Sequence, residues 1–313
     1  MIKYFYIIPF LAIGLSVSAQ KEITTSSARN NDKSIDFNYI NEGYGNYYAM
    51  VKLNDLKNCS CNDEIFGYIN NKQGTIAKIK PSDNSVSITF STYTVRYFLG
   101  YPNNRIDTNF VYTLPIPPNT EYIIGKPGLI SATLTGEKTP DAYKSFSFRT
   151  KVPTDLLSIR KGIVVKIVDK YDVTPGTKHS FKSSTNSMTI QHEDGSLAEY
   201  IGFAKGTVKV TPGDVVYPQT PLAQAVKYNE DDKTYRFSVR VFYLKKDAFS
   251  IKRPENFKES LDALIYNYVN TNFYYGDEEP KIGDKKPSKA PEVPKEILQK
   301  ELSKKELKKL AQK

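Results

Sequence analysis

The chain has 313 residues, a formal net charge of +10 and 39% hydrophobic residues, which suffices for the cores of about two domains. Tyr (23) and Phe (16) are abundant, Trp is absent, and 17 Gly and 18 Pro accompany them. Enrichment in aromatic and β-branched residues together with many turn formers favours a mostly β architecture and argues against a helical bundle.

Residues 1–19 have the pattern of a signal peptide. Lys3 precedes an apolar run over residues 4–13, and the small residues at 17–19 fit a signal-peptidase site. The run is too short for a stable membrane span. We therefore expect cleavage near Ala19 and export to the periplasm or the extracellular side of the envelope, with an uncleaved anchor as the alternative. No Cys follows the site, so a lipid anchor is not expected there.

Residues 20–36 are rich in Ser, Thr, Asn and Lys without an apolar period, which predicts a flexible lead-in. Residues 37–107 contain short strand-like segments at a spacing typical of a small β-sandwich. The expected strands are Tyr47–Leu53, Thr75–Ile79, Ser85–Phe90 and Tyr93–Leu99.

The two cysteines of the chain, Cys59 and Cys61, form a Cys-Ser-Cys sequence in a polar stretch. In an oxidising compartment two cysteines this close can form a small-ring disulfide. Two ligands alone make a poor zinc site. A loop disulfide or two exported thiols is therefore the prediction, and a redox or metal role is the alternative.

Residues 108–250 are predicted to form a second antiparallel β domain. Asp194-Gly195 is typical of a tight hairpin turn, because such turns need positive φ angles. Pro212-Gly213-Asp214 predicts another reversal. The strands expected around these turns are Lys161–Val168, Met188–Ile190, Ala198–Ile201, Val208–Val210 and Val215–Val216.

The amino-acid sequence of this region resembles that of the lysostaphin/LytM-type zinc endopeptidases, which cut peptide cross-links in bacterial cell walls. The resemblance spans residues 110–243. It is carried by Gly-Ile-Val-Val from Gly162, by Ile-x-His-x-Asp-Gly over 190–195, and by Val-x-Val-x-x-Gly-Asp-x-Val over 208–216. Phe110–Ile116, Gly125–Ala132 and Phe237–Val239 look like that family's first strand, glycine-rich turn and last core strand. It implies a LytM-like β fold with a groove.

The family binds zinc through two histidines and an aspartate, whereas this chain has two histidines in all. At the matching zinc-ligand positions stand Ala132, Ser147, Thr234 and Arg236, and Gly202 stands where a further active-site histidine is found. A guanidinium has no lone pair to donate and is repelled by a divalent cation. The resemblance therefore implies an inactive member with no catalytic residue and no zinc.

The remaining histidines fall outside the ligand positions. His192 matches Ile-x-His-x-Asp-Gly, which does not bind metal in relatives, and His179 lies in a polar stretch. The residues expected to line the former groove are His192, Tyr200 and Arg236. The alternatives are a metal site built from Asp141, Asp155 or His179, and a serine nucleophile at Ser147 or Ser238, which would need a base.

Residues 251–276 are predicted to be a C-terminal extension that is mainly helical. Leu261, Leu264, Ile265 and Tyr268 have helical spacing within 257–275. A helix packed on the preceding domain follows from that spacing, and a pair of strands is the alternative.

Residues 277–313 form a tail rich in Lys and Pro. From Lys281 onward, eleven Lys stand against five Asp or Glu, a net of +6 of the total +10. The prolines predict an extended linker, followed by a short amphipathic helix over 297–310. Without a continuous apolar face, the tail is expected to be solvated and to add little stability. Contact with an anionic surface, lipid headgroups or wall polymers, is the alternative.

Three classes of function are compatible with these patterns. The first is a binding or regulatory module of the cell envelope that recognises peptidoglycan or a wall-hydrolase partner. The second is an active zinc endopeptidase with a displaced site, and the third is a structural envelope protein. Nucleic acid is not an expected partner, because aromatic residues do not interleave with the basic run. Stoichiometric zinc would separate the first two classes.

Overall fold

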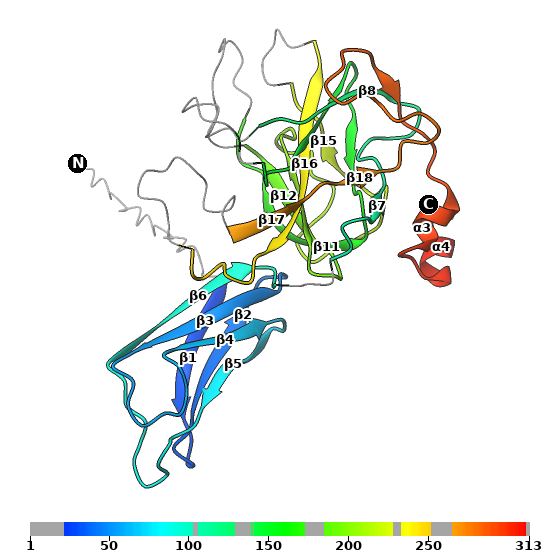
Figure 1. Ribbon diagram of the computed structural model, residues 1–313. Helices are drawn as coiled ribbons and strands as arrows, with labels where there is room; N and C mark the ends of the chain where they lie inside the picture. The colour runs from blue at the N-terminus through cyan, green and yellow to red at the C-terminus, as the bar shows by residue number, and fades with distance from the viewer. Residues whose placement is uncertain are drawn as a thin grey trace, which may run out of the picture.

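The computed structural model describes residues 22–102, 106–128, 139, 141–172, 185–227, 233–251 and 265–310. Over these residues the chain is mostly β with two short helices, which confirms the predicted fold class. A smaller N-terminal β unit lies against one end of a larger β unit, and the C-terminal helices lie beside the larger unit (Figure 1). No helix in the described ranges is long and apolar enough to cross a membrane.

The N-terminal unit consists of two three-stranded antiparallel sheets, in the orders β1-β2-β5 and β4-β3-β6. Along β2, Ile35, Phe37 and Tyr39 alternate inward and are buried, as a strand with one core-facing side requires. The bounds are β1 Ile23–Arg29, β2 Ile35–Asn41, β3 Tyr47–Asn54, β4 Glu64–Ile69, β5 Gln73–Ile79 and β6 Thr92–Leu99. Cys59 and Cys61 form a disulfide in the β3–β4 connection.

Two expectations for this unit are wrong. The lead-in is not flexible from residue 23 on, because β1 pairs with β2 from Ile23↔Asn41 to Arg29↔Ile35. It is an edge strand with only Ile23 buried, so it carries no apolar period in its sequence. Residues 85–90 are not a strand. The Asp83 carboxylate accepts hydrogen bonds from the Ser85 N–H (2.8 Å) and hydroxyl (2.7 Å), which closes a turn.

The larger unit is built on a nine-stranded sheet in the order β14-β11-β12-β13-β16-β9-β8-β19, with β17 also pairing with β16. The bounds are β8 Glu121–Gly125, β9 Phe146–Thr150, β11 Gly162–Val168, β12 Ser187–Gln191, β13 Leu197–Ile201, β14 Val215–Val216, β16 Tyr235–Leu244, β17 Tyr266–Val269 and β19 Ser288–Lys289. Two short pairs complete it, antiparallel β10 Asp155–Leu157 with β15 Pro221–Gln224, and parallel β7 Val111–Tyr112 with β18 Asn272–Phe273. The stretch 208–210, expected as a strand, is not one.

The hairpin between β12 and β13 is also one of the places where the two units meet. Gly195 turns the chain with φ +86°, and a Cβ there would come within 2.8 Å of the Tyr101 ring. Nearby, the Asn46 N–H donates to Gln191 Oε1 (2.8 Å). The Asp-Gly turn therefore serves both the reversal and the close approach of the N-terminal unit.

The extension after residue 250 is not helical where it is described, apart from Ile265. Residues 266–269 and 272–273 are strands, so the alternative of two strands is the observed one; residues 252–264 lie outside the described ranges. β9 pairs with the first half of β16, and β17 continues the same edge, from Val241↔Val269 to Leu244↔Tyr266. Pairing with β17 satisfies the backbone N–H and C=O groups of Val241–Leu244, which a helix at this position would leave without partners.

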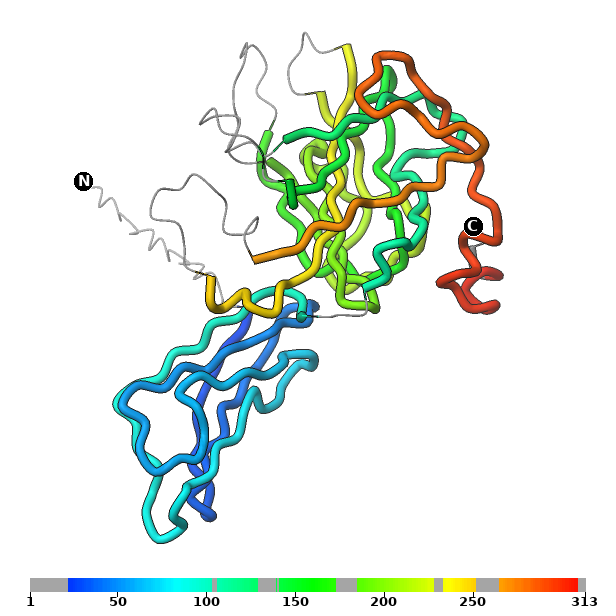
Figure 2. Tube along the Cα trace, in the orientation of Figure 1, coloured from blue at the N-terminus to red at the C-terminus, as the bar shows by residue number. Residues whose placement is uncertain are grey.

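The tail is docked on the larger unit, contrary to the expectation of a solvated segment. β19 extends the sheet at β8, with Ser288 opposite Tyr122. Ala290 is buried in the core, and its N–H and C=O bond to Thr120 (2.9 Å) and Asn119 (2.8 Å). Figure 2 traces this segment along the body to the helices α3 (Lys295–Gln299) and α4 (Lys304–Leu310).

We predict that deletion of residues 281–313 lowers the Tm by roughly 5 °C or more. The deletion exposes the edge of β8 and the part of the core that Ala290 covers, and for a chain of this size about 1 kcal/mol corresponds to a few degrees. Thermal unfolding followed by circular dichroism tests this, with removal of residues 311–313 as the control. An unchanged Tm in the long deletion would show that the tail does not dock.

Candidate functional site

Two of the positions predicted to have lost zinc ligands lie on adjacent antiparallel strands. Ser147 on β9 faces Ser238 on β16, and Arg149 faces Arg236. Side chains alternate along a strand, so these four lie on one side of the sheet, opposite the buried Phe148 and Phe237. We call the surface formed by Ser147, Arg149, Arg236 and Ser238 the outer face.

The other predicted positions are distributed around this surface. Thr234 immediately precedes β16 and is half-buried. Gly202 follows β13 with φ +89°, and its N–H donates to the Asn186 carbonyl (2.9 Å). Ala132 and His179 lie outside the described residues. The register thus places Ser147 and Arg236 on adjacent strands, and Ala132 lies outside the described residues.

The chemistry of the outer face is that of hydroxyls and guanidinium groups. Hydroxyls are weak ligands for zinc, and guanidinium groups donate five hydrogen bonds and accept none. Over the described part of the chain, no group of three or more His, Cys, Asp or Glu side chains could hold a metal ion. Asp155, an alternative ligand, is ion-paired with Lys209 (2.5 Å). Two arginines favour anionic groups such as carboxylates over cations.

One end of the outer face is closed by a second ion pair, between Arg240 on β16 and Glu199 on β13. The Arg240 Nε donates to Glu199 Oε2 at 2.5 Å, and its Nη1 lies 3.4 Å from the Tyr143 hydroxyl. The rings of Phe242 and Tyr268 lie within 6 Å of the guanidinium. Sequence reasoning missed this pair, because the residues become neighbours only in the strand register.

Two hollows adjoin the strands of the outer face. One, of about 230 Å³, is lined by Lys126, Asp141 and Tyr143 with their neighbours. The other, of about 430 Å³, lies between Lys126 and the residues of the C-terminal extension around Asn270 and Glu279. The second is lined mainly by polar groups, and the first by both polar and apolar groups. The region around the start of β9 is therefore concave and presents hydrogen-bonding groups, among them Ser145 and Lys126.

His192 and Tyr200 do not line a groove, and that prediction is wrong. His192 is 2% exposed and Tyr200 is fully buried. The Tyr200 hydroxyl accepts a hydrogen bond from the Ile159 N–H (2.8 Å), so it joins β13 to the segment before β11. Of the three predicted groove residues, only Arg236 is partly exposed and on the outer face.

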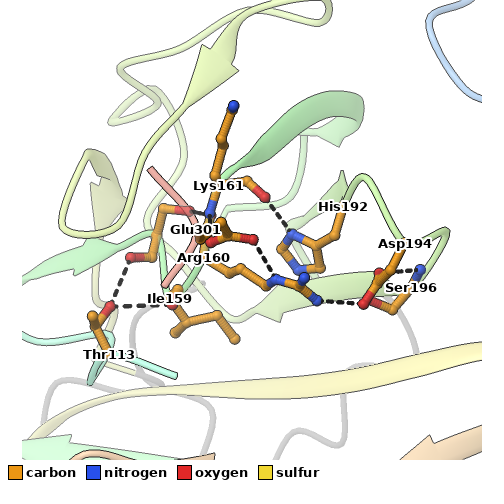
Figure 3. A network of polar contacts seen from close by, with 9 residues as sticks. Thr113, Ile159, Arg160, Lys161, His192, Asp194, Ser196 and Glu301 are labelled. Carbon is orange, nitrogen blue, oxygen red and sulfur yellow. Dashed lines mark hydrogen bonds and ion pairs between the residues drawn. The ribbon is translucent and has the colours of Figure 1, made fainter. Parts of the chain in front are cut away.

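The most extensive polar network of the larger unit centres on Arg160, which is only 8% exposed (Figure 3). Its Nε lies 2.6 Å from Glu301 Oε1 and its Nη1 2.6 Å from Asp194 Oδ2. The guanidinium stacks over the Phe110 ring, 4.1 Å from the centroid. One buried cation therefore joins the start of β11, the hairpin turn and the C-terminal helices.

Lys161 continues this network into the helices. Its N–H donates to Glu301 Oε2 (3.0 Å), and its Nζ lies 2.8 Å from Glu306 Oε1. Glu306 also accepts from the Ser303 N–H (2.8 Å), and the Ser303 hydroxyl accepts from the Glu306 N–H (3.3 Å). The bond to Lys161 and those to Ser303 lower the pKa of Glu306 to about 2. Ser-x-x-Glu is a capping box, a local signal that sequence analysis could have used.

His192 lies beside Arg160 as a neutral ring. Its Nδ1 is 2.7 Å from the Lys161 carbonyl oxygen, so the Nδ1–H donates there. Burial, and after it the Arg160 charge, lower the pKa of His192 to about 4. Burial raises the pKa of Glu301, against the attraction of Arg160. His192 thus supports the strand ends and the Arg160 network and has no access to a ligand.

No protein-family model matches the chain, and no curated protein matches it. Solved structures similar to it include the M23 metalloprotease pseudoalterin from the deep sea (15% identity, TM-score 0.29, covering 42% of this chain and 70% of that one). A zinc-containing peptidase from Vibrio cholerae has 12% identity and a TM-score of 0.26, with 71% and 75% covered. The SpoIIQ–SpoIIIAH pore-forming complex has 14% identity and a TM-score of 0.26, with 42% and 82% covered.

We predict that Glu301→Gln destabilises the protein by about 2–3 kcal/mol, because it leaves a buried guanidinium with one carboxylate partner while keeping the side-chain shape. Glu296→Gln, an exposed glutamate of α3, is the matched control and should change stability by less than about 0.5 kcal/mol. Urea unfolding of both variants measures the difference. Equal stabilities would remove Glu301 from the interactions that hold the fold.

We predict that His192 makes the protein less stable in acid. The unfolded chain binds a proton on this ring near pH 6.5 and the folded chain only near pH 4, so the free energy of unfolding falls as the pH drops through that window. His192→Asn keeps a donor for the Lys161 carbonyl but does not titrate. Its loss between pH 6.5 and 4 should be smaller by on the order of 3 kcal/mol.

Urea unfolding at several pH values measures this difference. It isolates the histidine, because Glu301 and Asp194 titrate in both proteins. Parallel pH profiles of the two proteins would contradict the buried neutral ring.

Proposed function

We propose that this protein is an exported, non-catalytic LytM-like binding module of the bacterial cell envelope, and that its ligand is peptidoglycan. The observation that carries the proposal is the pairing of β9 with β16. Ser147 and Arg236, which match ligand positions of the family, stand together on one face of adjacent strands, yet neither has a side chain that zinc prefers.

A site that has lost several zinc ligands can still bind a peptide but cannot hydrolyse it. A hydrolytic zinc needs three protein ligands and an open position at which bound water is acidified. Loss of one ligand weakens such a site, whereas loss of all of them removes the coordination sphere. The strands do not depend on it, because backbone ladders and glycine turns such as Gly195 hold them.

The outer face suits a peptide that carries carboxylates. Arg149 is exposed and Arg236 partly exposed, and Lys126 lines both adjoining hollows. Guanidinium groups bind carboxylates through paired hydrogen bonds. The peptide stems of the cell wall have this chemistry. A wall-hydrolase partner that presents an acidic segment to the same face is the second candidate.

The first test concerns zinc and turnover. Purified mature protein should retain less than stoichiometric zinc after dialysis and should release no muropeptides from purified sacculi. One zinc per chain together with release that a chelator abolishes would establish the alternative, an active endopeptidase with a displaced site.

The second test concerns binding. We expect the protein to sediment with purified sacculi and Arg149→Glu to weaken that binding about tenfold or more, since it replaces an attractive charge by a repulsive one on the outer face. Lys78→Glu, on β5 of the N-terminal unit, is the control with the same change of charge. Equal binding by all three proteins would place the peptidoglycan site elsewhere, and no binding to sacculi by the unaltered protein would favour the protein partner.

A further inference from the structure

The larger of the two hollows, of about 430 Å³, lies where the C-terminal extension meets the larger unit, and we call it the extension hollow. It is lined by β18, which pairs with β7 (Figure 1), by the connection from β17 to β18, and by Lys126 after β8. Pockets of this size hold small ligands. Most of its lining residues lie outside the stretch 110–243 that resembles the LytM-type enzymes, so the resemblance assigns it no role.

Free hydrogen-bonding groups border the extension hollow. Asn109, Asn270 and Asn272 are exposed, and each side-chain amide can donate two hydrogen bonds and accept two. The Asn270 Oδ1 accepts a hydrogen bond from Lys126 Nζ (3.5 Å). Among the residues that the structure describes, the amides of Asn109 and Asn272 and the hydroxyl of Thr108 have no hydrogen-bond partner. They are available to a ligand that offers both donors and acceptors.

The charges that line the extension hollow cancel. Among its described lining residues, Lys126 and Glu279 are the ones that are charged at neutral pH. The Lys126 Nζ also lies 5.3 Å from the centre of the Phe146 ring, so part of its charge is engaged inside the molecule. A net charge of zero gives no net attraction for an anion or a cation. The hollow therefore suits an uncharged polar ligand.

Two side chains add apolar surface to this polar lining. Tyr275 is half-buried against Phe273, with the ring centres 6.3 Å apart, and Ile282 is 37% exposed. The negative face of an aromatic ring attracts the C–H groups on the flat side of a sugar ring. Ile282 offers a contact for a methyl group. An N-acetylated sugar combines these features, because it has hydroxyls, an amide, a flat C–H face and a methyl group.

An extended peptide fits the extension hollow less well. Peptides in extended form bind mainly by adding a strand to the edge of a sheet. The strand that lines this hollow, β18, has only two residues, Asn272 and Phe273. The hollow thus offers side-chain amides and one aromatic ring, and no long strand edge.

We propose that the extension hollow binds an N-acetylated sugar of a glycan chain. The source of the sugar rests on the proposed function, in which the ligand is peptidoglycan, a polymer of glycan strands and peptides. Lys126 lines both this hollow and the smaller one at the start of β9, so the two sites adjoin. The wall polymer then makes two contacts, with its peptide at the outer face and with its glycan at the extension hollow.

Isothermal titration calorimetry with the β-1,4-linked tetramer of N-acetylglucosamine tests this proposal, because the probe carries no peptide and no charge. The tetramer should bind, and about 0.5 M salt should leave its affinity unchanged, since no ion pair forms. Cellotetraose, which lacks the acetamido groups, should bind about tenfold more weakly or not at all. Equal affinity for the two tetramers would overturn the choice of an N-acetylated sugar.

The combined variant Asn109→Ala and Asn272→Ala should weaken binding of the N-acetylglucosamine tetramer about tenfold or more, since it removes two amides that bond the ligand. Both side chains are exposed, so the Tm should not change. The matched control is Asn62→Ala with Asn71→Ala, two exposed asparagines of the N-terminal unit. It should bind as the unaltered protein does, and equal weakening by the two double variants would overturn the assignment to the extension hollow.

Comparison with purified sacculi separates this proposal from the proposed function. Binding to sacculi without binding to the N-acetylglucosamine tetramer would overturn the sugar site and leave peptidoglycan as the ligand of the outer face. Binding to the tetramer without binding to sacculi would support the sugar site and overturn peptidoglycan as the ligand.

Discussion

The structure of the larger unit depends on the neutralisation of one buried cation. Arg160 lies at the start of β11 and is almost fully enclosed, and a guanidinium cannot lose its charge there. An unpaired buried charge costs several kcal/mol, so carboxylates must be brought to it. They come from Asp194 in the hairpin turn and from Glu301 near the end of the chain. The Arg160 guanidinium therefore holds both the hairpin turn and the C-terminal tail in place.

This constraint accounts for the course of the C-terminal segment. To place Glu301 beside Arg160, the chain pairs β17 with β16, β18 with β7 and β19 with β8 on its way. Each pairing satisfies backbone groups that would otherwise remain at a strand edge. The extension is thus part of the sheet rather than an appendage, and its lysines face outward because its glutamates are required inside.

The sequence was sufficient to predict those elements that are determined by neighbouring residues. The Asp194-Gly195 turn, the strands flanking it and the overall β class follow from turn residues and alternation. The strands of the extension and the docking of Glu301 do not, because each depends on a partner well away in the sequence. The strand β1 was missed for another reason: its partner β2 is the next strand, but as an edge strand with only Ile23 buried it has no apolar alternation. The burial of His192 and Tyr200 also escaped prediction, since alternation does not tell which side of a sheet faces the core.

The outer face carries two arginines and, among the residues that the structure describes, no group of side chains that could hold a metal ion. In the family that the sequence resembles, zinc contributes positive charge that orients anionic or polarised groups of the peptide, and it acidifies the attacking water. The Arg236 guanidinium supplies a permanent positive charge at a position that the resemblance matches to a zinc ligand, on the strand next to Ser147. It can orient a carboxylate by hydrogen bonds, yet it has no vacant orbital that would acidify water. The proposed function therefore assigns to Arg236 the binding of an anionic peptide and no part in its cleavage.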